Sequence, residues 1–394
     1  MSSSPERKRK RPKKKSSLNE PRVLEPAREP TQNPSLPDDL IVSCLARVSR
    51  LEYPKLSLVS KSFRSLLASP ELYKTRSSLA LTESCLYVCI SFANDSIHHW
   101  FTLCRKPDRT LTTNKRKKKP SGYVLAKLPT HHSRSAHWSG LVTVGSDIYN
   151  IGGPVGDDKK PSSSISILDC RSNTWREGPS LLVKRNYPHA NVIDGKIYVT
   201  GDSNSSSPQW MEVFDPKTQT WELVSSPPAQ IRLLYDHIST SAGIDGKVHI
   251  FGSSNGLAYD TREGRWESVG MEMSSEWVWF SYCVVQNVIY FYYDGEFKWY
   301  DTKARLWRVL KGLKGLPKFP RYIARLAAYD GGKMAVFWDR VVASTGYVDK
   351  MIWCAVIALE RRNDEEIWGK VEWKDAVLKV PKSCRINHTL AATL

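Results

Sequence analysis

The chain has 394 residues, of which 41% are hydrophobic, so it can hold two or more domains around a large core. Its formal net charge of +18 first suggests a nucleic-acid ligand, but thirteen positive charges lie in residues 7–15 and 115–119, which leaves the remainder at only +5. No apolar run approaches the ~20 residues of a membrane span. The eight cysteines form no C-x-x-C pair, which indicates reduced thiols in the cytosol or nucleus.

Residues 1–29 are predicted to form a disordered basic tail, because they are rich in Lys, Arg and Pro and almost lack aliphatic side chains. The run RKRKRPKKK at residues 7–15 is either a solvated arm or a nuclear-import signal, since import receptors recognise clustered basic residues in an extended chain. We therefore expect the protein in the nucleus, the cytoplasm or both, with the run favouring the nucleus. Nucleic-acid binding is disfavoured, because no aromatic side chains alternate with the charges.

The pattern becomes helical between residues 35 and 73. Pro37 suits the first turn of a helix, and Asp38 and Asp39 favour the positive end of its dipole. Two apolar stripes with helical spacing follow, at residues 40–48 and 56–67. A unit of about forty residues cannot bury itself, so it must give its apolar surface to a neighbouring domain or to a partner.

Strand signals dominate from about residue 79 onward. The segments DGKIYVTG (194–201) and DGKVHIFG (245–252) place Asp-Gly between apolar runs, a strong hairpin signal. Each unit continues with a strand that ends in Asp and a last strand that opens with Trp six residues later. This pair occurs four times, as Asp169 and Trp175, Asp215 and Trp221, Asp260 and Trp266, and Asp301 and Trp307.

These tryptophans recur every 41 to 46 residues, the length of four antiparallel strands in one propeller blade. The Asp is expected to accept backbone N–H groups in the turn between the third and fourth strands, and the Trp ring to fill space between blades. The pair is therefore interpreted as scaffold. Residues 83–129 and 322–381 share the strand rhythm without the pair, so the sequence predicts a mainly β fold with six blades.

The segment SLPDDLIVSCLARVSRLEYPKLSLVSKSFRSLLASPELY (35–73) resembles an F-box, and the repeats resemble kelch motifs. Residues 30–381 are similar to the F-box/kelch-repeat proteins of plants, including the blade opening ESCLYVCISF and WFTLCRKP. The resemblance implies a tail at 1–29, an F-box at 30–76 and a kelch-type β-propeller at 77–385. The chain departs from the kelch pattern because it keeps the paired glycines only at Gly152–Gly153.

The resemblance implies a substrate-recognition subunit of a Skp–cullin–F-box (SCF) ubiquitin ligase, which is not itself an enzyme. The F-box would dock on a Skp-type adaptor, and through it on a cullin core, while the propeller binds the target protein. The alternatives are a kelch scaffold that assembles no ligase, and helices that pack on the propeller alone. The adaptor-binding residues carried over from the family are Leu36, Pro37, Leu40, Ile41, Leu45, Val48, Leu56, Val59, Phe63 and Leu67.

A third hypothesis for the function, after the substrate receptor and the scaffold, is a kelch-type metalloenzyme. The histidines of HHSRSAH (131–137) have no clear metal-ligand spacing, and the neighbours His98 and His99 are poorly placed to hold one ion. No phosphate-binding loop or nucleophile elbow is present. We therefore expect no metal, no cofactor and no catalytic residues.

Four arginines precede the first strand of four units, and they form the candidate target-binding set. Equivalent positions in successive blades form a ring around the central channel. Such a ring would favour an acidic or phosphorylated segment of the target. The alternative is that each arginine pairs locally with a carboxylate or a backbone carbonyl. The four residues are Arg134, Arg185, Arg232 and Arg321.

Overall fold

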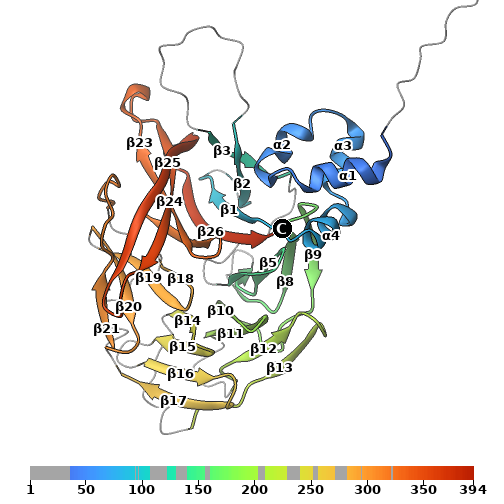
Figure 1. The fold of residues 1–394 in the computed structure, drawn as a ribbon. Helices are drawn as coiled ribbons and strands as arrows, with labels where there is room; N and C mark the ends of the chain where they lie inside the picture. Colours follow the sequence, from blue (N-terminus) through green and yellow to red (C-terminus); the bar gives the residue numbers. More distant parts are fainter. Residues whose placement is uncertain are drawn as a thin grey trace, which may run out of the picture.

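Six four-stranded antiparallel sheets, preceded by a group of short helices, make up the computed structural model of the protein (Figure 1). The structure describes residues 36–93, 95, 97–106, 122–129, 140–155, 160–202, 209–228, 240–251, 256–270, 282–293, 295–320 and 323–394. The predicted mainly β fold with six blades and a small helical unit is confirmed. The basic runs at 7–15 and 115–119 lie outside the described residues.

The helical unit begins where the sequence predicts it. Asp38 and Asp39 occupy the first turn of the first helix, and Ser60 and Ser69 cap later helices by accepting the N–H groups of Phe63 and Leu72. The elements are α1 (Asp38–Ala46), the 3-10 helix η1 (Arg50–Glu52), α2 (Tyr53–Leu56), α3 (Lys61–Leu67) and α4 (Pro70–Ser78).

The blades are numbered along the chain. Blade 1 contains β26 (Arg385–Thr393), β1 (Ser84–Ser91), β2 (His99–Arg105) and β3 (Tyr123–Lys127). Blade 2 contains β4 (Leu141–Val144), β5 (Asp147–Ile151), β8 (Ile165–Asp169) and β9 (Thr174–Gly178). A small hairpin of β6 (Pro154–Val155) and β7 (Lys160–Pro161) lies between β5 and β8 in the sequence. Blade 3 contains β10 (Tyr187–Ile193), β11 (Lys196–Asp202), β12 (Glu212–Asp215) and β13 (Thr220–Leu223).

The other three blades repeat this order. Blade 4 contains β14 (Thr240–Ile244), β15 (Lys247–Phe251), β16 (Gly256–Asp260) and β17 (Arg265–Val269). Blade 5 contains β18 (Tyr282–Val285), β19 (Val288–Tyr293), β20 (Glu296–Asp301) and β21 (Leu306–Val309). Blade 6 contains β22 (Arg325–Tyr329), β23 (Lys333–Val341), β24 (Asp349–Arg361) and β25 (Ile367–Pro381), with the 3-10 helix η3 (Ala343–Thr345) between β23 and β24.

The blades close into a ring. Contacts between the innermost strands run from β4 through β10, β14, β18, β22 and β26 and return to β4. Blade 1 takes its innermost strand from the C-terminus, since β26 pairs with β1 from Ser84 opposite Thr393 to Ser91 opposite Arg385. The predicted propeller boundary at residue 385 therefore cuts off this strand, and the propeller continues to the end of β26.

The Asp and the Trp of each repeated pair have different structural roles. Asp215 accepts the N–H of Lys217 in the turn between β12 and β13, and Asp260 accepts two N–H groups in the equivalent turn of blade 4. The Trp221 indole donates to the Pro179 carbonyl, which follows the last strand of blade 2. The Trp266 indole likewise donates to the Ser225 carbonyl, and Trp175 and Trp307 contact the preceding blade through apolar packing. Asp169 and Asp301 accept equivalent turn N–H groups.

Candidate functional site

The helical unit has a buried face that packs on the propeller. Val42, Leu45 and Ala46 of α1 lie in one cluster with Leu67, Leu72 and Tyr73 of the later helices. The same cluster contains blade 1 side chains, including Tyr87 and Trp100, and blade 2 side chains, including Ile148 and Leu168. Since both blades contribute to it, this cluster joins the helical unit to the propeller.

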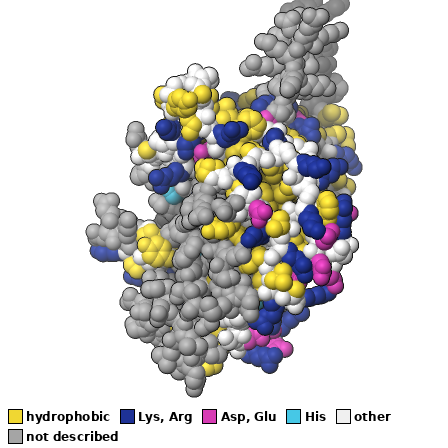
Figure 2. Space-filling view, turned by 90° about the vertical axis from the view of Figure 1, so that its left-hand side faces the viewer, with side chains coloured by type: hydrophobic (Ala, Val, Ile, Leu, Met, Phe, Trp, Pro, Cys, Tyr) yellow, Lys and Arg dark blue, Asp and Glu magenta, His cyan; other side chains and the backbone are white. Residues whose placement is uncertain are grey.

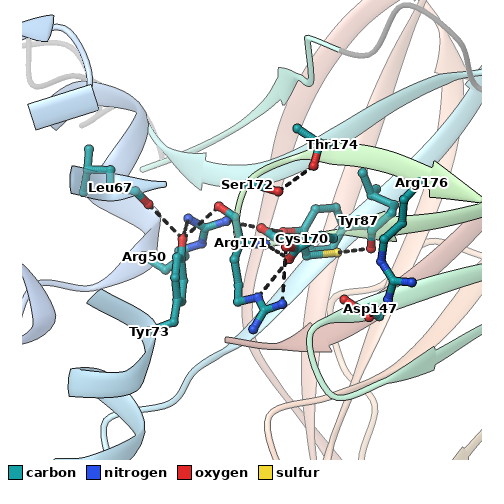
Figure 3. A network of polar contacts seen from close by, with 12 residues as sticks. Arg50, Leu67, Tyr73, Tyr87, Asp147, Cys170, Arg171, Ser172, Thr174 and Arg176 are labelled. Atoms are coloured by element: carbon teal, nitrogen blue, oxygen red, sulfur yellow. Dashed lines mark hydrogen bonds and ion pairs between the residues drawn. The ribbon is translucent and has the colours of Figure 1, made fainter. Parts of the chain in front are cut away.

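A polar network, shown in Figure 3, strengthens this joint. The Arg50 guanidinium donates to the Cys170 carbonyl at 2.5 Å and to the Tyr73 hydroxyl. The Tyr73 oxygen lies 3.1 Å from the carbonyls of both Leu67 and Arg171, so it links α3 to the turn between β8 and β9. Burial raises the pKa of Tyr73 to about 12, which keeps its hydroxyl protonated as a donor.

Arg76 holds the helices of the unit to one another. Its side chain is buried, and Nη1 donates to the carbonyls of Ala46 and Val48 at 3.0 and 2.8 Å. Nη2 donates to the Leu81 carbonyl at 2.6 Å and lies 3.4 Å from a Glu83 carboxylate oxygen. The same carboxylate accepts the backbone N–H of Arg50 at 2.6 Å, so a single acid connects α4, η1 and the start of blade 1.

The helical unit also carries large apolar side chains that are exposed to solvent. Leu36, Leu40, Leu58 and Val59 are each more than half exposed, and Pro37 is exposed with them. Cys44 lies one helical turn beyond Leu40 on α1 and is the exposed member of the eight cysteines. We call Leu36, Pro37, Leu40, Cys44, Leu58 and Val59 the outer face.

The structure divides the ten predicted adaptor-binding residues into three groups. Leu45 and Leu67 are only 4% and 6% exposed, so the prediction that they contact an adaptor is wrong: they fill the joint with the propeller. Sequence reasoning missed Leu58, because it counted helical spacing through a segment where α2 has already ended. Four of the ten lie on the outer face (Leu36, Pro37, Leu40 and Val59), and four are partly buried beside the joint (Ile41, Val48, Leu56 and Phe63).

The second candidate site is a cavity of about 310 Å³ on the propeller axis. The innermost strands of all six blades line it, and its polar groups include Asn191, Tyr282, Asn387 and His388. Arg325 adds a positive charge, while no Asp or Glu belongs to the lining among the described residues. Burial lowers the pKa of Arg325 to about 10, so it is still a cation at neutral pH.

The predicted arginine ring is wrong at Arg185. This side chain is fully buried, and its Nε donates to Glu212 Oε1 at 2.9 Å while Nη1 donates to the Gly201 carbonyl at 2.7 Å. Burial lowers the pKa of Arg185, and the Glu212 carboxylate opposes this shift. Arg185 therefore ties together the strands of blade 3, while Arg134, Arg232 and Arg321 lie outside the described residues. Arg325, four residues after Arg321 in PRYIARL, was missed because it falls inside a strand.

The described residues contain no group of three or more His, Cys, Asp or Glu side chains arranged to hold a metal ion. His99 instead pairs with Asp95 at 2.5 Å, and His131, His132 and His137 lie outside the described part of the chain. None of the helices described is both long and apolar enough to cross a membrane.

Comparison with known proteins matches both the helical unit and the propeller to known families. The family model for an F-box domain matches residues 34–75, and that for the FKB95 Kelch-repeats domain matches residues 100–378. Arabidopsis thaliana F-box/kelch-repeat protein At4g39550 is 60% identical over the full length of both chains. At4g39580 is 54% identical over 93% of this chain and 95% of its own, and At4g39570 is 52% identical over the whole of both.

Proposed function

Because the chain belongs to the F-box/kelch-repeat protein family of plants, we propose that it is the substrate-recognition subunit of an SCF ubiquitin ligase. In this proposal the F-box docks on a Skp-type adaptor, the propeller binds the target protein, and other subunits transfer ubiquitin. The chain then contributes recognition and positioning, with no catalysis and no cofactor of its own.

The observation that carries the proposal is the outer face. Four large aliphatic side chains, Leu36, Leu40, Leu58 and Val59, are exposed on a unit of which another part is already buried against the propeller. Clustered exposed apolar residues mark a surface that another protein covers. The buried joint leaves this side accessible, which is what a docking unit fixed to a recognition domain requires.

The arginine-bearing cavity on the propeller axis supports target binding by the propeller. Arg325 contributes a positive charge to the lining, and this charge would attract an acidic group on the target. We also propose a location in the nucleus, the cytoplasm or both, and the basic run at residues 7–15 favours the nucleus.

Co-purification with a Skp-type adaptor tests the proposal. We expect the full chain to retain the adaptor, and the variant Leu36→Ser/Leu40→Ser/Val59→Ser to retain at least about tenfold less, since burying each aliphatic side chain contributes about 1.5–3 kcal/mol. The variant should keep the thermal unfolding midpoint of the wild type. The matched control is Leu182→Ser/Leu223→Ser, which replaces exposed leucines on the propeller and should leave adaptor retention unchanged. Failure of the wild-type chain to retain the adaptor would favour a scaffold that assembles no ligase.

A further inference from the structure

Blade 6 is built differently from the blades before it. Its strands β23, β24 and β25 have 9, 13 and 15 residues, longer than any strand of blades 2 to 5, and they extend past the body of the propeller at the upper left of Figure 1. Met334, Val336 and Trp338 alternate along β23 and pack toward blade 5. The next residue on the same side, Arg340, lies beyond this core and is exposed.

A pocket of about 330 Å³ lies at this end of the blade. Trp338 and Trp353 are direct cross-strand neighbours, and their rings lie nearly parallel, with centroids 6.2 Å apart and planes at 13°. Leu316 and Pro317 line the pocket from the segment that precedes β22. The pocket therefore has an aromatic surface and an apolar wall, and its volume is at the lower end of the range for small-ligand sites.

Trp338, which lines this pocket, has an indole N–H without a hydrogen-bond acceptor in the part of the chain that the structure describes. Trp338 is only 2% exposed, and its Nε1 has no acceptor among the described residues. A buried donor without a partner costs about 1–3 kcal/mol, and native proteins usually satisfy such groups. A bound ligand with an acceptor oxygen would remove this cost.

Two cations complete the lining. Arg340 and Lys374 are both exposed, and neither forms an ion pair within the described part of the chain. Lys374 donates to the Gly315 carbonyl, which places its ammonium group beside the pocket wall. Figure 2, which faces the left-hand side of Figure 1, shows hydrophobic side chains at the upper end of this surface with Lys and Arg beside them.

We propose that this pocket binds a flat apolar ring that carries a carboxylate. The ring would pack against Trp353 and the apolar wall of Leu316 and Pro317, and the carboxylate would accept hydrogen bonds from Arg340 and Lys374. Two sources have this chemistry: a free aromatic acid, and an aromatic side chain next to an acidic residue in a peptide. The site does not depend on ligase assembly, because none of its residues belongs to the helical unit.

Calorimetric titration of the full chain without adaptor tests the site. We expect 2-naphthoate to bind with a submillimolar Kd, and its uncharged analogue 2-naphthamide to bind at least about fivefold more weakly. Arg340→Ala should weaken 2-naphthoate binding by about five- to tenfold and leave 2-naphthamide binding nearly unchanged. The control Lys370→Ala removes an exposed cation from the same strand as Lys374 and should change neither affinity.

A capped Trp-Glu dipeptide identifies the source of the ligand. Tighter binding of the dipeptide than of 2-naphthoate supports the site and indicates a peptide, and the reverse order supports the site and indicates a free acid. A second readout is the indole N–H resonance of Trp338, assigned with Trp338→Phe, which should shift on addition of 2-naphthoate. The proposal is overturned by equal affinity for naphthoate and naphthamide, by unchanged binding in Arg340→Ala, or by no binding of any ligand at about 10 mM. A ligand that does not bind at about 10 mM has a binding free energy weaker than about 3 kcal/mol.

Discussion

Arg76 shows how a single buried side chain can hold a small unit together. Its guanidinium donates to the carbonyls of Ala46 and Val48 at the end of α1 and to the carbonyl of Leu81 after α4. We expect Arg76→Met to lower the free energy of unfolding by about 3–5 kcal/mol, because these carbonyls lose their donor and Glu83 loses its cationic partner.

Urea unfolding of the full chain measures this loss. Arg47→Met is the matched control, since Arg47 is exposed and its side chain bonds, within the described part of the chain, to Ser43 alone, and it should change stability by less than about 0.5 kcal/mol. Equal effects of the two variants would show that Arg76 does not hold the unit together.

His249 makes the stability of the propeller depend on pH. Burial, with a smaller contribution from Lys247, lowers the pKa of His249 from 6.5 to about 4, and its Nδ1 has no partner among the described residues. The unfolded chain therefore binds the proton more tightly than the folded chain. This contribution to stability is complete above pH 6.5 and is lost as the pH falls toward 4, by about 3 kcal/mol at most.

The variant His249→Phe tests this, because phenylalanine keeps the ring beside Phe251 and cannot be protonated. Carboxylates also titrate near pH 4, so the quantity to compare is the difference in unfolding free energy between the two proteins at pH 7 and at pH 4.5. We expect the variant to be more stable relative to the wild type at pH 4.5 than at pH 7. An unchanged difference would mean that His249 takes up a proton equally well in the folded and unfolded chains.

The residues of the candidate sites could be predicted only in part. Helical spacing placed Leu40 and Leu45 in one apolar stripe, but a spacing cannot tell the side that faces the propeller from the side that faces solvent. Arg185 stands before its strand as the ring hypothesis requires, but Glu212 comes close to it only through the folding of blade 3. The pocket in blade 6 depends on Trp338 standing opposite Trp353, and that register is fixed by strand pairing over a long hairpin.

At the scale of elements, local signals predicted turns well and long-range pairing poorly. Asp194-Gly195 and Asp245-Gly246 both adopt the positive φ angles that a tight hairpin turn needs. The innermost strand of blade 1 gave no such signal, because its partner β1 lies at the opposite end of the propeller sequence and β26 contains no turn or Asp–Trp pair.

Closure by β26 predicts a strong effect of C-terminal truncation. A chain that ends at Cys384 loses the strand that pairs with β1 and contacts both β22 and β4, so two interfaces between blades lose a partner. We expect this chain to be largely insoluble or to unfold without a cooperative transition, as followed by circular dichroism. Replacing exposed Thr393 with Ala at the end of the same strand should leave the transition unchanged. A truncated chain with wild-type cooperativity would show that the ring closes without β26.

At the scale of the whole molecule, the helical unit and the propeller form one connected body. The hydrophobic joint and the Arg50 network bind the inner side of the unit to blades 1 and 2, and the outer face is left exposed to solvent. A rigid joint would hold a bound target at a fixed distance and angle from the adaptor. This arrangement could not be read from the helical stripes, because both the docking surface and the joint are apolar.

The most direct test of this account is the alkylation rate of Cys44 with and without a Skp-type adaptor. Cys44 is the exposed thiol on the outer face, and the other seven cysteines are buried, so the wild-type chain carries its own reporter. We predict that a saturating concentration of adaptor slows labelling of Cys44 by at least about tenfold, while the chain with Leu36→Ser/Leu40→Ser/Val59→Ser labels at the same rate with and without adaptor. An adaptor complex in which Cys44 of the wild-type chain reacts as fast as in the isolated chain would contradict docking on the outer face.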